Sequence, residues 1–163
     1  MSDGPRKGQA DMDHNRDEVR EFVTATIGDQ RCGIAVLQVQ DVLAPQRITP
    51  IPLAPAEVAG SLNLRGRIVT AIDLRVRMGL PRREEGTHTM SIVVEHRNEL
   101  YSLIVDDVGE VMKVSEKTFE RNPATLDPLW RTYSAGVYRL EEGLLVALDV
   151  DTLLAFQSHD EAA

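Results

Sequence analysis

The chain has 163 residues, a net charge of −8 and 42% hydrophobic residues, which suits one domain or two intimately packed halves. The acidic charge argues against nucleic acid as a partner, because its phosphates would be repelled. A single cysteine, Cys32, excludes an internal disulfide and a cysteine-based zinc site. No apolar run approaches the length of about 18 residues that a membrane helix requires, so no direct membrane insertion is expected.

Both ends of the chain are polar. Residues 1–17 and 157–163 are predicted to be disordered tails, which leaves 18–156 for the folded domain. The first tail lacks the apolar centre of a secretory signal, so we expect a cytoplasmic protein.

The first half of the domain is predicted to consist of short strands with two helices. Alternating apolar residues indicate strands, apolar residues at helical spacing indicate the first helix, and Asp73 is placed to cap the second. The predicted segments are a hairpin at 21–26 and 31–36, a helix at 36–44, a strand at 47–51, a hairpin at 60–73 and a helix at 74–79.

The second half repeats this alternation of strands and turns. Its last helix is expected to begin at a cap supplied by Asp149 or Asp151. The predicted segments are a hairpin at 89–95 and 100–105, its extension at 108–114, a polar loop at 115–128, a hairpin at 133–140 and 143–149, and a helix at 151–156.

One stretch of the sequence occurs twice. Residues 59–74, AGSLNLRGRIVTAIDL, return without a gap at 135–150 as AGVYRLEEGLLVALDV. Because the apolar positions keep their character while the turns diverge, the repeat indicates one small β unit used twice, and it directs attention to the turn at Arg65.

Many short strands and a repeated unit favour two small barrels. We expect the first barrel at about 35–80 and the second at about 88–150, with terminal elements packing across the halves. The polar segment 81–87 is the expected crossing between them.

The sequence offers little material for catalysis. His88 and His96 lie near the ends of one predicted strand and are expected at the surface, whereas Cys32 falls in a predicted buried strand. Asp106 and Asp107 lack the spacing of a calcium loop and are expected to form a solvated turn. We therefore predict a protein that is not an enzyme, with no metal and no cofactor.

Several segments resemble the CheW family of chemotaxis coupling proteins. They are VLQVQDVL, ITPIPLAP, GSLNLRGRIVTAIDLRVRMGL, LIVDDVGEVM and YSAGVYRLEEGLLVALDVDTLL, which together extend over roughly 21–156. The resemblance implies a mainly β fold of two intertwined, five-stranded SH3-like barrels with short helices, including a C-terminal helix. It also implies an adaptor that joins the cytoplasmic tips of methyl-accepting chemoreceptors to the regulatory domain of the histidine kinase CheA, within membrane-associated receptor arrays.

The resemblance further implies a receptor-binding groove between the barrels. Val36, Val39 and Val42 match the residues that line it, and Asp41 and Arg65 match an ion pair beside it. An exposed ion pair contributes only about 0 to 1 kcal/mol to stability, so its value would lie in fixing the turn and meeting a partner's charge. The alternative is a solvated arginine in a tight turn.

For the kinase, the resemblance points to Gly60 and to a loop that includes Pro123 and Leu126. A glycine suits a close backbone approach, although Gly60 could equally serve a bend of the barrel. In the loop, Leu126 or Leu129 is the candidate apolar anchor. Trp130 is expected in the core, with a second anchor as the alternative.

The chain also departs from the family pattern. Cys32 stands where the family usually has an aromatic residue, Asp41 where it has glutamate, and Thr125 or Leu126 where it has a second aromatic residue. Two other functions stay open. One is a related protein that scaffolds a chemosensory cluster not concerned with motility, and a distant one is a small-barrel enzyme using His88 or the carboxylates at 106–107.

Overall fold

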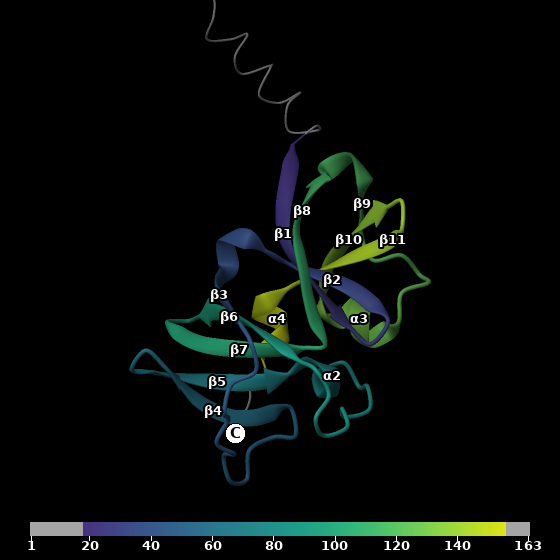
Figure 1. Ribbon diagram of the computed structural model, residues 1–163. Helices are drawn as coiled ribbons and strands as arrows, with labels where there is room; N and C mark the ends of the chain where they lie inside the picture. Colours follow the sequence, from purple (N-terminus) through teal and green to yellow (C-terminus); the bar gives the residue numbers. More distant parts are fainter. Residues whose placement is uncertain (1–17, 156–163) are drawn as a thin grey trace, which may run out of the picture.

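The structure is a computed structural model that describes residues 18–155. The predicted tails at 1–17 and 157–163, and Phe156 of the predicted last helix, lie outside this range. Most of the described chain forms two β-sheets joined by short helices (Figure 1). The predicted mainly β fold of two SH3-like units with short helices is confirmed, although one sheet has six strands where the resemblance implied five.

The first sheet, here called the terminal sheet, takes its strands from both ends of the described chain. Its six strands follow the order β8-β1-β2-β11-β10-β9, and only β2 and β11 pair in parallel. The strands are β1 (Val19–Ile27), β2 (Gln30–Ala35), β8 (Asp107–Ser115), β9 (Phe119–Glu120), β10 (Ser134–Leu140) and β11 (Gly143–Leu148).

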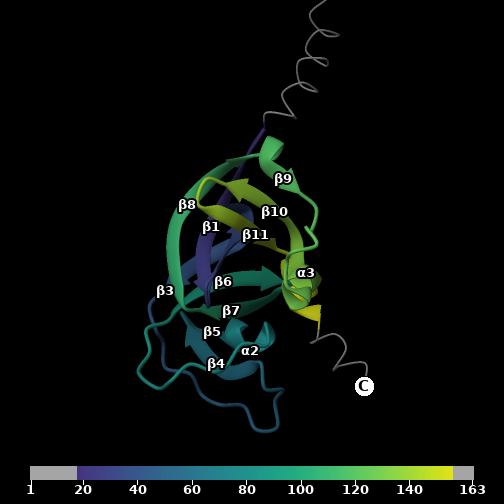
Figure 2. The same ribbon diagram turned by 90° about the vertical axis from the view of Figure 1, so that its right-hand side faces the viewer.

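The second sheet, the central sheet, comes from one continuous segment. Its five strands follow the order β3-β6-β7-β5-β4, with β5 and β7 in parallel. The strands are β3 (Val39–Leu43), β4 (Val58–Leu64), β5 (Arg67–Asp73), β6 (Met90–His96) and β7 (Glu99–Val105). In Figures 1 and 2 this sheet lies below the terminal sheet.

The sequence predicted a division of the strands between the two halves that differs from the division in the structure. The β6–β7 hairpin was expected in a second barrel starting at about residue 88, but it belongs to the central sheet with β3, β4 and β5. The reason is the parallel pairing of β5 with β7, in which Val69 lies opposite Leu100. Such long-range pairing leaves no local signature in a sequence pattern.

The repeated segments occupy equivalent places in the two sheets. Gly60 lies opposite Ala71 and Gly136 opposite Ala147, each beside a register shift. Each repeat then pairs in parallel with a hairpin contributed by the other half of the chain, β5 with β7 and β11 with β2. The repeat is therefore one β unit used twice, and the exchange of hairpins intertwines the halves.

Aspartates begin the helices that follow the two repeats, as predicted. Asp73 accepts a hydrogen bond from Arg75 N at the start of α2 (Leu74–Arg77). Asp149, rather than Asp151, caps α4 (Val150–Leu153). No helix within 18–155 is long and apolar enough to span a membrane.

A third helix, α3 (Pro128–Tyr133), was not predicted. It begins where Asp127 accepts a hydrogen bond from Leu129 N and Pro128 occupies the first turn. The Asp-Pro pair is a recognised helix start, so the signal was present at the end of the segment predicted to be a polar loop.

The helix predicted at 36–44 is wrong. Only η1 (Val36–Gln38) is helical, as a single 3-10 turn, and the chain continues as strand β3. Pairing with β6, in which Val42 lies opposite Ile92, outweighs the helical spacing. The strand predicted at 47–51 is reduced to one bridge between Thr49 and Ser61, because the prolines around it cannot donate to a ladder.

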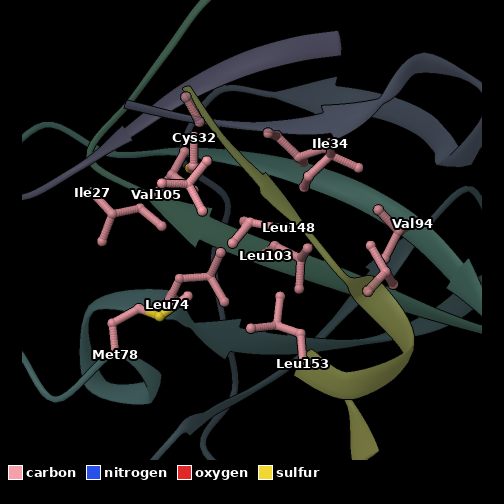
Figure 3. Close-up of a cluster of buried hydrophobic side chains, with 14 of the residues drawn as sticks. Ile27, Cys32, Ile34, Leu74, Met78, Val94, Leu103, Val105, Leu148 and Leu153 are labelled. Carbon is pink, nitrogen blue, oxygen red and sulfur yellow. The ribbon is translucent and has the colours of Figure 1, made fainter. Parts of the chain in front are cut away.

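The main hydrophobic core fills the space between the two sheets. Side chains from β1, β2, β6, β7, β11 and the short helices meet there, including Leu153 of the last helix (Figure 3). Smaller buried clusters lie over each sheet. The residues labelled in the figure are Ile27, Cys32, Ile34, Leu74, Met78, Val94, Leu103, Val105, Leu148 and Leu153. This shared core fixes one half against the other.

Candidate functional site

The ion pair expected between Asp41 and Arg65 is present. Arg65 Nη2 donates to Asp41 Oδ2 at 3.0 Å and links the β4–β5 turn to the edge strand β3. Asp41 Oδ1 also accepts a hydrogen bond from Val42 N at 2.9 Å. Because β3 and β4 are the two edge strands of the central sheet, this pair connects its opposite edges.

The turn itself sets the position of the arginine. Arg65 and Gly66 have φ values of 51° and 87°, as a type I′ hairpin turn requires. Asn63 Oδ1 accepts a hydrogen bond from Gly66 N at 2.9 Å and closes the turn. The Arg65 side chain is 76% exposed, whereas that of Asp41 is 28% exposed. The carboxylate thus restrains a guanidinium that still faces solvent.

The apolar residues expected in the groove lie along β3 and the turn before it, and the bulge between Val39 and Asp41 leaves Val39 and Val42 on one face, opposite Val94 and Ile92. Val36 and Val39 are half-buried and pack against the main core. Val42 is 37% exposed, and it points to the opposite face from Asp41, since successive strand residues alternate. Leu37, which the sequence analysis did not single out, is 97% exposed beside them.

Gly60, expected at the kinase contact, is buried beneath a crossing segment. Its φ is 148°, and a Cβ atom there would lie 2.2 Å from Thr49 O and 2.7 Å from Ile48 Cγ2. Thr49 in turn exchanges two backbone hydrogen bonds of 2.8 Å with Ser61. Glycine is therefore required for packing, and the residue supports the chain at 48–49 instead of presenting a surface.

The second expected kinase contact is also partly buried. Leu126 is 7% exposed and Trp130 is 6% exposed, and both belong to the main core. Pro123 is half-buried. Of the two candidate apolar anchors, only Leu129 reaches the surface, at 39% exposure. Leu126 is thus corrected from a possible surface anchor to a core residue, since the turn into α3 directs it inward.

The sequence predicted that Asp106 lies in a solvated turn, and this prediction is wrong. It accepts hydrogen bonds from Gly28 N at 2.7 Å, Arg83 Nε at 2.6 Å and Arg75 Nη1 at 2.9 Å. Burial alone would raise the pKa of this carboxyl, but the hydrogen bonds and the charge of Arg83 hold the pKa below its ordinary value. Arg83, only 8% exposed, also contacts Asp73 at 2.7 Å. Sequence reasoning missed this cluster, because its members lie in three separate polar segments.

The remaining candidate chemical groups are dispersed. His96 is buried, contrary to expectation, and its Nδ1 lies 3.1 Å from Asp151 Oδ1, whereas His88 is exposed. Burial of Cys32, followed by the charge of Asp106, raises the pKa of the thiol to about 12. Within 18–155, no three histidine, cysteine or carboxylate side chains cluster as metal ligands. The ion pair and apolar edge around β3 favour recognition of another protein.

Comparisons with known proteins identify the family of this chain. Residues 21–158 match the family described as the CheW-like domain. The chemotaxis protein CheW of Rhizobium meliloti is 26% identical over 143 residues, which cover 88% of this chain and 92% of that protein. The chemotaxis protein CheW of Klebsiella aerogenes is 30% identical over 136 residues, covering 83% and 82%.

A solved structure is similar as well. The crystal structure of the scaffolding protein TtCheW from Thermoanaerobacter tengcongensis superposes with a TM-score of 0.75 at 28% identity, covering 83% of this chain and 92% of that chain. The likeness thus extends over sequence and fold together, and over nearly the whole of the described residues. This chain belongs to the CheW family.

Proposed function

We propose that this chain is a non-catalytic adaptor of chemotaxis signalling, which couples chemoreceptor tips to the regulatory domain of the histidine kinase CheA. Membership of the CheW family supports this role, as do relatives named as chemotaxis proteins and a solved relative named as a scaffolding protein. The adaptor works in the cytoplasm, is recruited to membrane-associated receptor arrays and needs no cofactor.

The observation that carries the proposal is the Asp41–Arg65 pair, which connects the edge strand β3 to the β4–β5 turn. Asp41 limits the rotamers of a long side chain, so less conformational entropy is lost when Arg65 meets a partner. The guanidinium remains mostly exposed and presents donors in the fork geometry that suits a carboxylate. An acidic residue on a receptor helix is therefore the fitting counterpart.

Apolar side chains beside the pair complete the proposed receptor surface. Leu37 and Val42 are exposed, whereas Val36 and Val39 of the same segment are half-buried. An amphipathic helix binds such a surface through apolar residues spaced three and four positions apart. The arginine would then fix the orientation of the helix, while the apolar residues supply most of the binding free energy.

The test compares Arg65→Glu with the matched control Arg67→Glu, a neighbouring exposed arginine at the start of β5. Both variants make the same change in net charge. Arg65→Glu should weaken binding of a purified receptor cytoplasmic fragment by about tenfold or more, since it loses a charge-assisted contact and adds repulsion. Arg67→Glu should stay within about twofold of the unmodified protein.

Circular dichroism establishes that both variants are folded before binding is measured. A folded Arg65→Glu variant with unchanged receptor affinity would remove Arg65 from the proposed site. The double variant Asp41→Arg, Arg65→Asp restores an ion pair with reversed polarity. If Arg65 meets a receptor carboxylate directly, this double variant should be folded but remain defective in receptor binding.

A further inference from the structure

The sequence repeat extends beyond residues 59–74 and 135–150. At the same spacing, residues 80–87, LPRREEGT, correspond to residues 156–163, FQSHDEAA. Each segment begins with an apolar residue, and in each a basic residue, Arg83 or His159, is followed by two acidic residues. The two segments also follow helices in equivalent places, α2 and α4. The contacts of the first segment therefore indicate a role for the second.

In the first half, residues 80–87 fold back over the ends of β5 and β7. Leu80 packs against the main core, and the side chain of Arg83 is only 8% exposed. Arg83 Nη1 donates to Asp73 Oδ1 at 2.7 Å, and Arg83 Nε donates to Asp106 Oδ1 at 2.6 Å. Arg83 Nη2 donates to Ile104 O at 3.5 Å. The segment thus buries its basic residue against the aspartate that caps α2.

The equivalent place in the other half follows from the strand register. β11 pairs with β2 as β5 pairs with β7, so Ala35 is the counterpart of Ile104, and Asp149 is the counterpart of Asp73. A cavity of about 530 Å³ opens there, and both Ala35 and Asp149 line it. Within residues 18–155, the side chain of Asp149 accepts hydrogen bonds only from Thr152 of its own helix, whereas Asp73 also pairs with an arginine.

The cavity suits a positively charged group. Its wall includes the rings of Phe22 and Tyr138, whose centroids are 5.3 Å apart. The Tyr138 hydroxyl donates to Glu116 Oε1 at 2.7 Å, and Arg20 Nε lies 3.5 Å from the same oxygen. Because Arg20 offsets the charge of Glu116, the charge of Asp149 is left without a cationic partner in the described part of the chain. Aromatic faces beside a carboxylate favour a planar cation.

We infer that residues 156–163 close over this cavity as their counterparts close over the first half, with the imidazolium of His159 against Asp149. His159 is as many residues from Asp149 as Arg83 is from Asp73, so the segment is long enough to reach the carboxylate. The charges are complementary, and an imidazolium donates hydrogen bonds from both ring nitrogens. The polar composition that predicted a disordered tail is thus also what a cover over an acidic cavity requires.

Closure should depend on pH, because histidine gains its charge near neutral pH. The charged and titratable groups that face the cavity are Arg20 of β1, Glu116 of η2, Tyr138 of β10 and Asp149 before α4. Two carboxylates against one guanidinium favour the protonated imidazole. The closed state should therefore be favoured below the ordinary histidine pKa of about 6.5, and should be lost as the pH rises through the higher pKa of the closed state.

Nuclear magnetic resonance of the full chain tests this inference. His159 should titrate with a midpoint about half a pH unit or more above that of the same residue in a peptide of residues 154–163. His159→Gln and truncation after Ala155 should each shift the amide resonances of Ala35 and Tyr138. His14→Gln, which removes an imidazole near the other end of the chain, is the matched control and should leave those resonances unchanged.

Unchanged resonances of Ala35 and Tyr138 after truncation overturn the inference, as does a His159 midpoint equal to that in the peptide. Shifts that appear only as the protein concentration is raised would assign the cavity to the segment of a second copy, and would overturn closure within one chain. If the truncated chain fails to fold, His159→Gln still decides, because it keeps every apolar residue. Neither receptor nor kinase enters these measurements, so their outcome does not depend on the proposed function.

Discussion

The two repeats share their packing but differ at their turns. Both contain a buried glycine with a positive φ, 148° at Gly60 and 144° at Gly136. In both, the residue before the last is an aspartate that caps a helix. At the turns the charges are reversed. Arg65 pairs with Asp41 of β3, whereas Glu142 lies 3.6 Å from Arg31 of β2.

The difference separates two kinds of constraint. Positions that must fit the sheet are repeated, because a change there affects close-packed neighbours. The turns project into solvent and tolerate opposite charges, so each half can meet a different partner with the same scaffold. The comparison can be tested at the glycines, at the crossings between the sheets and at the turns.

The glycines should give the largest effect. Gly60→Ala places a methyl group against Thr49 O, a backbone atom that cannot move independently, and should lower the free energy of unfolding by about 3 kcal/mol. Gly136→Ala meets mainly the ring of Phe119, which is 36% exposed and can swing aside, and should cost about 1 to 2 kcal/mol. Urea unfolding measures both values. Equal losses would show that the two glycines are structurally interchangeable.

The crossing between the sheets at 105–107 should give the next effect. Asp106→Asn removes one of the two carboxylates that pair with the buried Arg83, Asp73 being the other, and should cost about 2 kcal/mol at neutral pH. Asp107→Asn alters an adjacent carboxylate that is 62% exposed, and should cost less than about 0.5 kcal/mol.

The contribution of Asp106 to the free energy of unfolding should also depend on pH. Because its pKa is lowered in the folded state, its stabilisation is complete above the unfolded-state pKa of about 4 and is lost as the pH falls through the lower folded value. The difference in stability between the unmodified protein and Asp106→Asn should therefore shrink as the pH falls below about 4. A constant difference down to pH 2 would contradict the role assigned to the ionised carboxyl.

Local features of the fold could be predicted from the sequence, and long-range pairings could not. The Arg65-Gly66 turn and the Asp73 cap follow from nearby residues, as does the repeat. The helix predicted at 36–44 failed because pairing with β6 decides the conformation of β3. The placement of β6 and β7 beside β5 likewise depends on contacts distant in the sequence.

The same limit applied to the candidate site. Family resemblance brought Asp41 and Arg65 together, and the structure shows that pair. Resemblance does not report burial, so Leu126 was considered a surface anchor although it lies in the core. The cluster around Asp106 was missed because its arginines come from a helix and a loop with no shared motif.

The turns should give the smallest change in stability and the clearest functional contrast. Glu142→Arg reverses the charge of the second turn as Arg65→Glu reverses that of the first. Both ion pairs involve exposed side chains, so each variant should lose less than about 1 kcal/mol of stability. Only Arg65→Glu should lose binding to the receptor fragment, because the first turn contacts β3 through Asp41, whereas the second turn contacts β2 through Arg31. Loss of receptor binding by Glu142→Arg would mean that the receptor surface extends to both repeats, and that the reversed charges serve one partner in common.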